Sequence, residues 1–111
     1  MTINEYQQEA LRTANGMNQD LPMIINCALG LTGEAGECAD IVKKAYFQGH
    51  PLLAYNLAKE LGDVAWYLAV MAHTIGYDLE SILQTNVDKL RNRYPDGFNA
   101  WRSLHRKAGD D

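Results

Sequence analysis

Two acidic stretches decide how this chain folds: Gly33-Glu34-Ala35-Gly36-Glu37 and Lys59-Glu60-Leu61-Gly62-Asp63. Each stretch places two carboxylates three positions apart, so both carboxylates lie on one face of a helix, roughly 5–6 Å apart between Cβ atoms. The residues around them are largely apolar, and an unpaired charge is costly in such surroundings. Four carboxylates that meet there would repel one another unless a cation lay among them.

Apolar spacing and stop signals predict four helices, over residues 3–15, 22–47, 52–75 and 79–92. Thr2 and Glu5 form a capping box for the first helix, and Asp20 can cap the second. Asn15-Gly16 and Gly76 are stop signals. No strand pattern competes, so we predict an all-α fold, an antiparallel four-helix bundle-like protomer. We expect one domain over residues 1–111, with residues 105–111 frayed.

Composition and charge narrow the class of protein. An apolar content of 47% is more than one thin bundle of 111 residues hides, which indicates an oligomeric interface. The net charge of −4 argues against a nucleic-acid polymer as partner. No signal-peptide pattern is present, and the longest apolar run, residues 64–71, is far shorter than the roughly 20 residues of a membrane span.

The two cysteines point to a cytoplasmic protein. Cys27 and Cys38 lie on one predicted helix, roughly 16 Å apart at about 1.5 Å per residue, which is too far for a disulfide. We therefore expect two reduced thiols in the cytoplasm.

The two acidic stretches are expected to meet. The loop around Gly49 is short, so the helices on either side of it should be antiparallel neighbours. Glu37 and Glu60 lie at nearly equal sequence distances from Gly49, as do Glu34 and Asp63. The members of each pair therefore stand level to within about one helical turn of roughly 5.4 Å. The spacing predicts one cluster of four carboxylates.

The ligand chemistry of this cluster indicates the metal. Neither acidic pair contains histidine, and an all-oxygen ligand set favours Mg²⁺, with Mn²⁺ as a possible substitute. Magnesium commonly binds through a few carboxylates together with substrate phosphates, which links the cluster to phosphate chemistry. The ordinary alternative for each carboxylate is a solvated position or an ion pair with Lys43, Lys44 or Lys59.

Glycines surround the first acidic pair. Gly30, Gly33 and Gly36 lie inside a predicted helix, where each costs about 1 kcal/mol relative to alanine. Something must therefore approach the backbone closely, which is either a neighbouring helix or a ligand.

Together with Asn86-Val87-Asp88-Lys89-Leu90-Arg91-Asn92-Arg93-Tyr94-Pro95, the acidic stretches resemble the signature of the MazG-like nucleotide pyrophosphohydrolases, the all-α NTP pyrophosphatase superfamily. The resemblance extends from about residue 7 to residue 98. It implies a helical bundle that forms a homodimer, or a tetramer built from two dimers. It also implies a Mg²⁺-dependent enzyme that cleaves a nucleoside triphosphate between the α and β phosphates, giving the monophosphate and pyrophosphate.

The resemblance also implies roles for the four carboxylates. Glu34, Glu37, Glu60 and Asp63 would be the metal ligands. From the charges at the site we expect Glu34 or Glu37 to be catalytic, orienting or deprotonating the attacking water instead of binding the metal directly.

Substrate contacts are implied further along the chain. Asn86, Lys89 and Arg93 share one face of the last predicted helix and would hold phosphate oxygens, although such a face is ordinarily just solvated. Lys44 could also reach a phosphate. Tyr67, one turn after Asp63, could contact the nucleotide, or it could simply belong to the core.

Three functions remain open at this point. The short chain suits nucleotide-pool housecleaning, and a phosphoribosyl-ATP pyrophosphohydrolase-like enzyme would use the same metal site. The third is a catalytically silent helical module for dimerisation or partner binding. The face formed by Asn86, Lys89 and Arg93 argues against this module, because assembly needs no phosphate clamp.

Overall fold

The computed structural model describes residues 1–15, 17 and 22–111. The all-α class is confirmed, and no strand occurs in these described ranges. The predicted cap Asp20 and the predicted stop at Gly16 lie outside the described residues. The helices are α1 (Ile3–Ala14), α2 (Met23–Phe47), α3 (Ala54–Thr74), α4 (Leu79–Arg93) and α5 (Ala100–Leu104).

Local sequence signals set the helix ends. At the start of α1 the Thr2 hydroxyl accepts a hydrogen bond from the backbone N–H of Glu5 at 3.1 Å, as the capping box predicts. At the end of α3 the chain turns at Gly76, whose φ is +88°. The Tyr77 N–H donates to the Ala72 carbonyl at 2.9 Å and the Gly76 N–H to the His73 carbonyl at 3.0 Å. These two bonds form a Schellman motif, in which glycine readily supplies the left-handed residue.

The chain divides into two compact units, Met1–Leu79 and Glu80–Asp111. Each unit is described by itself. The assignment of residues 1–111 to one domain stays a prediction.

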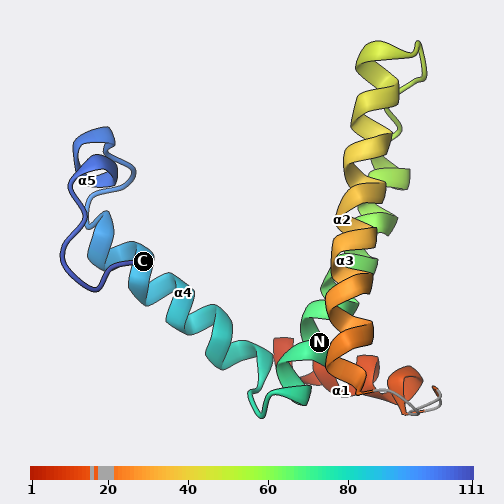
Figure 1. Ribbon diagram of the computed structural model, residues 1–111, viewed down its shortest axis with the longest axis horizontal. Helices are drawn as coiled ribbons and strands as arrows, with labels where there is room; N and C mark the ends of the chain where they lie inside the picture. The colour runs from red at the N-terminus through yellow and green to blue at the C-terminus, as the bar shows by residue number, and fades with distance from the viewer. Residues whose placement is uncertain (16, 18–21) are drawn as a thin grey trace. The chain divides into compact units, whose positions relative to one another are not determined.

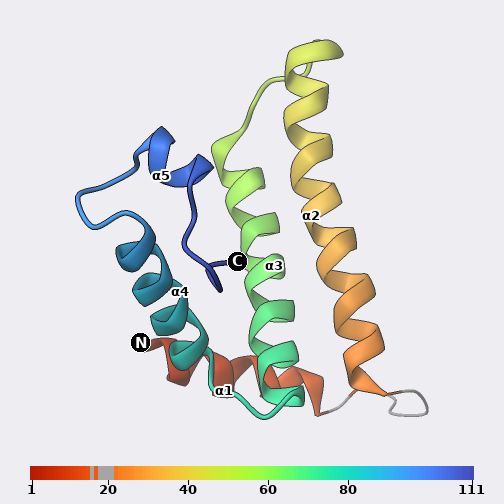
Figure 2. The same cartoon turned by 60° about the vertical axis from the view of Figure 1, so that its left-hand side comes forward.

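In the first unit, α2 and α3 lie side by side and run in opposite directions, and α1 crosses the end where α2 begins and α3 ends (Figures 1 and 2). The predicted antiparallel neighbours are therefore present. The buried core lies at this crossing and includes Ala10 and Leu11 of α1, Cys27 of α2, and Ala69 and Val70 of α3. Small residues dominate it, so the helices can approach closely.

One buried amide fastens α1 to the end of α3. The Gln7 side chain is 2% exposed. Its Nε2 donates to the carbonyls of Ala69 and Tyr77, both at 3.1 Å, and its Oε1 accepts from the Leu79 N–H at 3.1 Å. Every buried polar group in this contact is thereby satisfied, as stability requires.

A stripe of apolar residues along α3 stays open in the single chain. Near-heptad spacing predicts a bundle-packing face made of Leu53, Leu57, Leu61, Val64, Leu68, Met71 and Ile75. Three of these residues, Leu57, Val64 and Met71, are partly buried, whereas the other four remain 43–55% exposed. The neighbouring Ala69 and Val70 face the core instead. We call the following four residues the α3 stripe: Leu53, Leu61, Leu68 and Ile75.

The second unit contains most of α4 together with α5 and the residues after it. The rings of Tyr94 and Phe98 pack at 5.4 Å where the chain leaves α4, and Asn99 caps α5 by accepting from the Arg102 N–H at 3.0 Å. Both cysteines of the chain are free, as predicted. None of the described helices has the length and apolar character needed to cross a membrane.

Candidate metal and nucleotide site

Three of the four predicted carboxylates come together between α2 and α3. Glu34, Glu60 and Asp63 each place a carboxylate oxygen within 4.8 Å of the others. Glu34 and Glu60 are half-buried and Asp63 is exposed, so the group lies at the edge of the helix pair. These residues offer only oxygen ligands, which matches the preference of a hard divalent cation.

The electrostatics of Glu34 reflect this crowding. Desolvation, a side-chain hydrogen bond with Glu60 and the negative charges of Asp63, Glu60 and Glu37 together raise the pKa of Glu34. Mutual repulsion of this kind is relieved either by a proton or by a cation.

Glu37 lies apart from the three converging carboxylates. It is exposed on α2 and does not belong to the group that lies within 4.8 Å, although its charge still contributes to the raised pKa of Glu34. Its predicted part in metal binding or catalysis stays a prediction.

A pocket of about 410 Å³ opens beside the carboxylates. Two of the carboxylates contribute to its wall, and two aromatic side chains stand beside them with their ring centroids 4.9 Å apart in an edge-to-face arrangement. The Trp66 indole N–H donates to the Thr13 hydroxyl at 2.9 Å, which fixes the indole against α1. The residues that line the pocket are Thr13, Met17, Glu34, Asp63, Trp66 and Tyr67.

Tyr67 owes its position to one of the α2 glycines. A Cβ atom at Gly30 would lie 2.1 Å from Cε1 of Tyr67, so the ring packs directly on the α2 backbone. At Gly30 the glycine therefore serves tight helix packing. In the part of the chain that the structure describes, nothing lies within 4 Å of a Cβ atom built at Gly33 or Gly36.

α1 also reaches the site through Tyr6. Its hydroxyl donates to the Gly62 carbonyl at 3.4 Å, next to Asp63. Burial and the negative charge of Asp63 raise the pKa of Tyr6, so the phenol stays protonated at neutral pH. A neutral hydroxyl can lie near the carboxylates without adding to their repulsion.

Lys44, a predicted phosphate contact, is paired with Asp40. Its Nζ lies 2.8 Å from Oδ2 of Asp40, one helical turn earlier on α2. The hydrogen bond and the charge of Asp40 raise the pKa of Lys44, so the ammonium group is retained. A phosphate role for Lys44 remains a prediction and would require the lysine to exchange this partner.

The predicted phosphate face lies in the second unit, on α4. Asn86 and Lys89 are exposed, and Arg93 is largely buried. Both cations already have partners: Lys89 donates to the backbone oxygen of Asp111 at 2.9 Å, and Arg93 binds the carboxylate of Asp110.

The sequence analysis missed several residues that contribute to the two sites. Trp66 lies three positions after Asp63, the spacing that places two residues on one helix face, and this spacing could have identified it. Thr13, Met17 and Asp110 join their neighbours only through the folding of distant segments, and no local pattern marks them.

The sequence profile described as the MazG nucleotide pyrophosphohydrolase domain matches residues 25–98, which include both acidic pairs and the predicted phosphate face. The chain belongs to the MazG nucleotide pyrophosphohydrolase domain family. A curated relative, the Gene 37 protein of Mycobacterium phage L5, is 39% identical over 69 residues. That alignment covers 59% of this chain and 60% of the phage protein, so this MazG chain spans less than two thirds of its relative. No solved structure matches the chain.

Proposed function

We propose that this MazG-family chain is a Mg²⁺-dependent nucleoside triphosphate pyrophosphohydrolase, with Mn²⁺ as a possible substitute. It would cleave a (d)NTP between the α and β phosphates to give the monophosphate and pyrophosphate, in nucleotide-pool housecleaning. The observation that carries the proposal is the convergence of Glu34, Glu60 and Asp63 beside a pocket with aromatic walls.

The three carboxylates suit a divalent cation. Their oxygens lie within 4.8 Å of one another, and desolvation, the hydrogen bond with Glu60 and the neighbouring negative charges raise the pKa of Glu34. A bound cation would supply neutralisation of phosphate charge and a bound water with a lowered pKa. Glu34, Glu60 and Asp63 would hold it, with Glu37 as a fourth ligand, and either Glu34 or Glu37 would orient or deprotonate the attacking water.

The pocket would accept the nucleoside. Its volume of about 410 Å³ lies within the usual range of small-molecule sites, and Trp66 and Tyr67 offer aromatic surface for stacking. Asp63 and Glu34 line the same pocket, so a nucleoside there would have its phosphates beside the metal ligands. In the second unit, Asn86, Lys89 and Arg93 would bind phosphate oxygens.

The α3 stripe favours a second copy of this chain as partner. Leu53, Leu61, Leu68 and Ile75 follow the near-heptad spacing of a helix–helix interface, and all four are about half exposed. We therefore propose a homodimer, or a tetramer of two dimers.

The test of the enzymatic proposal measures pyrophosphate release from canonical and modified (d)NTPs, with and without Mg²⁺. We expect Mg²⁺-dependent release from at least one nucleotide. Replacing Glu60 with Gln or Asp63 with Asn should lower kcat by at least about 100-fold, the scale found when one electrostatic group is removed from a reacting centre. Helicity measured by circular dichroism should not change.

Glu9→Gln is the matched control, because Glu9 is an exposed carboxylate on α1 whose partner is Arg12 at 3.3 Å. It should retain full activity. Full activity in both Glu60→Gln and Asp63→Asn would contradict the ligand assignment. Thermal stabilisation by Mn²⁺ without hydrolysis of any nucleotide would favour the silent helical module.

A further inference from the structure

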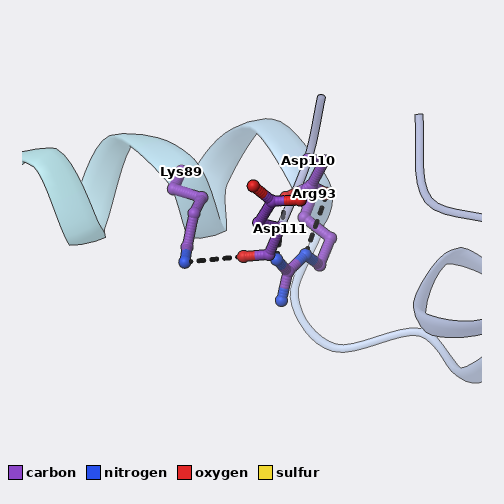
Figure 3. Close-up of polar contacts among 4 residues, drawn as sticks. All are labelled: Lys89, Arg93, Asp110 and Asp111. Atoms are coloured by element: carbon purple, nitrogen blue, oxygen red, sulfur yellow. Dashed lines mark hydrogen bonds and ion pairs between the residues drawn. The ribbon is translucent and has the colours of Figure 1, made fainter. Parts of the chain in front are cut away.

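Residues 107–111 fold back onto α4 and contact the two cations of the predicted phosphate face (Figure 3). Arg93 donates from Nε to Oδ2 of Asp110 at 2.9 Å and from Nη2 to Oδ1 at 2.7 Å. Lys89 donates from Nζ to the backbone oxygen of Asp111 at 2.9 Å. The forked guanidinium of Arg93 therefore already holds an anion that belongs to the same chain.

The surroundings of Asp110 are those of an anion site. The side chains of Arg93 and Asp110 are only 9% and 10% exposed. They border a cavity of about 150 Å³ whose lining also includes Arg102, Arg106 and Lys107. The hydrogen bond with Arg93, together with the charges of Arg93, Arg106 and Lys89, lowers the pKa of Asp110.

Carboxylate and phosphate compete for a guanidinium because both accept its two parallel N–H groups. While Asp110 accepts from Nε and Nη2 of Arg93, these donors are not available to a substrate. We propose that residues 107–111 act as an internal competitor of the substrate phosphates, and that Asp110 must leave Arg93 before a phosphate binds there. This inference rests on the proposed function for the roles of Lys89 and Arg93.

The fold-back depends on a sharp turn. The Asp110 N–H donates to the Lys107 carbonyl at 3.1 Å, and Gly109 has a φ of +85°, a conformation that side-chain-bearing residues rarely adopt. While the segment is closed it excludes an external anion, so the apparent dissociation constant of that anion equals the intrinsic one divided by the open fraction. If it is closed about nine-tenths of the time, the apparent dissociation constant is about tenfold higher than the intrinsic one.

The experiment measures binding of inorganic pyrophosphate to the full chain by titration calorimetry without divalent metal. Asp110→Asn keeps the side-chain shape and removes its charge, and it should tighten binding by about five- to tenfold. Asp96→Asn is the matched control, because it removes the same charge from an exposed residue of the same unit. The control should bind pyrophosphate as the unaltered chain does.

A comparison with a double variant shows whether the gain in pyrophosphate affinity depends on Arg93. In an Arg93→Gln background, adding Asp110→Asn should change the affinity by less than about twofold, because the contested guanidinium is gone. Equal or weaker pyrophosphate binding by Asp110→Asn in the otherwise unaltered chain would overturn the proposal and make the pair a permanent structural clamp. The absence of any pyrophosphate binding up to millimolar concentrations would overturn it too.

A second measurement needs no variant. Carbon NMR of the unaltered chain can follow the titration of the Asp110 carboxyl. The lowered pKa of Asp110 should rise toward its ordinary value when pyrophosphate saturates the site, because Arg93 then no longer binds the Asp110 carboxylate. An unchanged pKa at saturation would contradict displacement. This result stands even if the Asp110→Asn chain is poorly folded.

Turnover separates this inference from the proposed function. Tighter pyrophosphate binding by Asp110→Asn in a chain that hydrolyses no nucleotide would support the competitor and reject the enzyme. Mg²⁺-dependent hydrolysis with the same KM in Asp110→Asn and the unaltered chain would support the enzyme and reject the competitor. If the enzyme and the internal competitor are both correct, the KM of Asp110→Asn should be about fivefold lower than that of the unaltered chain, with kcat unchanged.

Discussion

Gln7 shows how one buried polar residue organises the first unit. It donates to the carbonyls of Ala69 in α3 and of Tyr77 in the turn after α3, and it accepts from the first N–H of α4, all at 3.1 Å. A lone glutamine in an amphipathic helix gives no sign of such a role, because its partners lie more than 60 positions away in the sequence.

Replacing Gln7 with Met should lower the free energy of unfolding by about 2–4 kcal/mol. Methionine fills a similar volume but leaves the Leu79 N–H and the Tyr77 carbonyl without their partner, and each unsatisfied buried group costs about 1–3 kcal/mol. Urea denaturation followed by circular dichroism measures the change. Gln8→Met makes the same substitution at an exposed neighbour and should change stability by less than about 0.5 kcal/mol. Equal stabilities of the two variants would refute the role of Gln7.

Asp110 gives the second unit a dependence on pH. Because Arg93 lowers its pKa in the folded state, ionised Asp110 stabilises the fold at pH values above the unfolded pKa of about 3.9. This contribution is lost as the pH falls through the folded pKa. The protection of residues 107–111 against amide hydrogen exchange, measured relative to the intrinsic rate at each pH, should therefore fall on acidification. In Asp110→Asn this pH-dependent loss of protection should be absent, and its persistence there would point to another group.

The packing of α3 on α2 depends on close contact with the α2 backbone as well as on apolar side chains. Gly30 of α2 lets the Tyr67 ring of α3 lie on the backbone beside the carboxylates. The glycine thereby shapes the wall of the pocket as well as the contact between α2 and α3.

Substituting Gly30 with Ala should lower the free energy of unfolding by about 1–3 kcal/mol, the usual cost of overpacking, although alanine favours a helix by about 1 kcal/mol. Gly33→Ala has open space in the described structure and should be neutral or stabilising by up to about 1 kcal/mol. Thermal denaturation compares the two variants. In a Tyr67→Leu background the cost at position 30 should shrink, because the clashing ring is absent. If the Gly30→Ala chain is as stable as the Gly33→Ala chain, the Tyr67 ring can move away from position 30 without a cost in stability.

The helices followed from the sequence because their signals are local. The capping box at Thr2 and the glycine at position 76 act within a few residues, and the short loop at Gly49 made the α2–α3 pairing predictable. The convergence of Glu34 with Asp63 followed from that pairing.

What the sequence could not reveal depends on tertiary placement. Gln7, Tyr67 and Asp110 find partners that no spacing rule identifies, and α5 is too short to give a clear periodic signal. The sequence also could not reveal that the α3 stripe is exposed in the single chain. Periodicity shows that residues share a helix face and does not show what covers that face.

At the scale of the whole molecule, the acidic cluster and the two cations of the predicted phosphate face lie in different units. The converging carboxylates belong to residues 1–79, and Lys89 and Arg93 belong to residues 80–111. The family match over residues 25–98 includes both sets. If the proposed function holds, metal binding would report on the first unit and pyrophosphate binding on the second, so each half of the proposed chemistry would have its own assay.

The α3 stripe yields a prediction about assembly. Light scattering coupled to size-exclusion chromatography should give a mass of at least twice the 12.4 kDa of one chain. Leu68→Lys combined with Ile75→Lys should reduce the mass to that of a monomer, because burying two ammonium groups in an apolar interface is costly. Both positions are about half exposed in the single chain, so the lysines can stay solvated there and helicity should persist. Tyr55→Lys adds a cation to a 74% exposed position of the same helix that faces away from Leu61 and Leu68, and it should leave the assembly intact. If the unaltered chain stays monomeric at high micromolar concentration, no second copy covers the α3 stripe. The homo-oligomer would then be rejected.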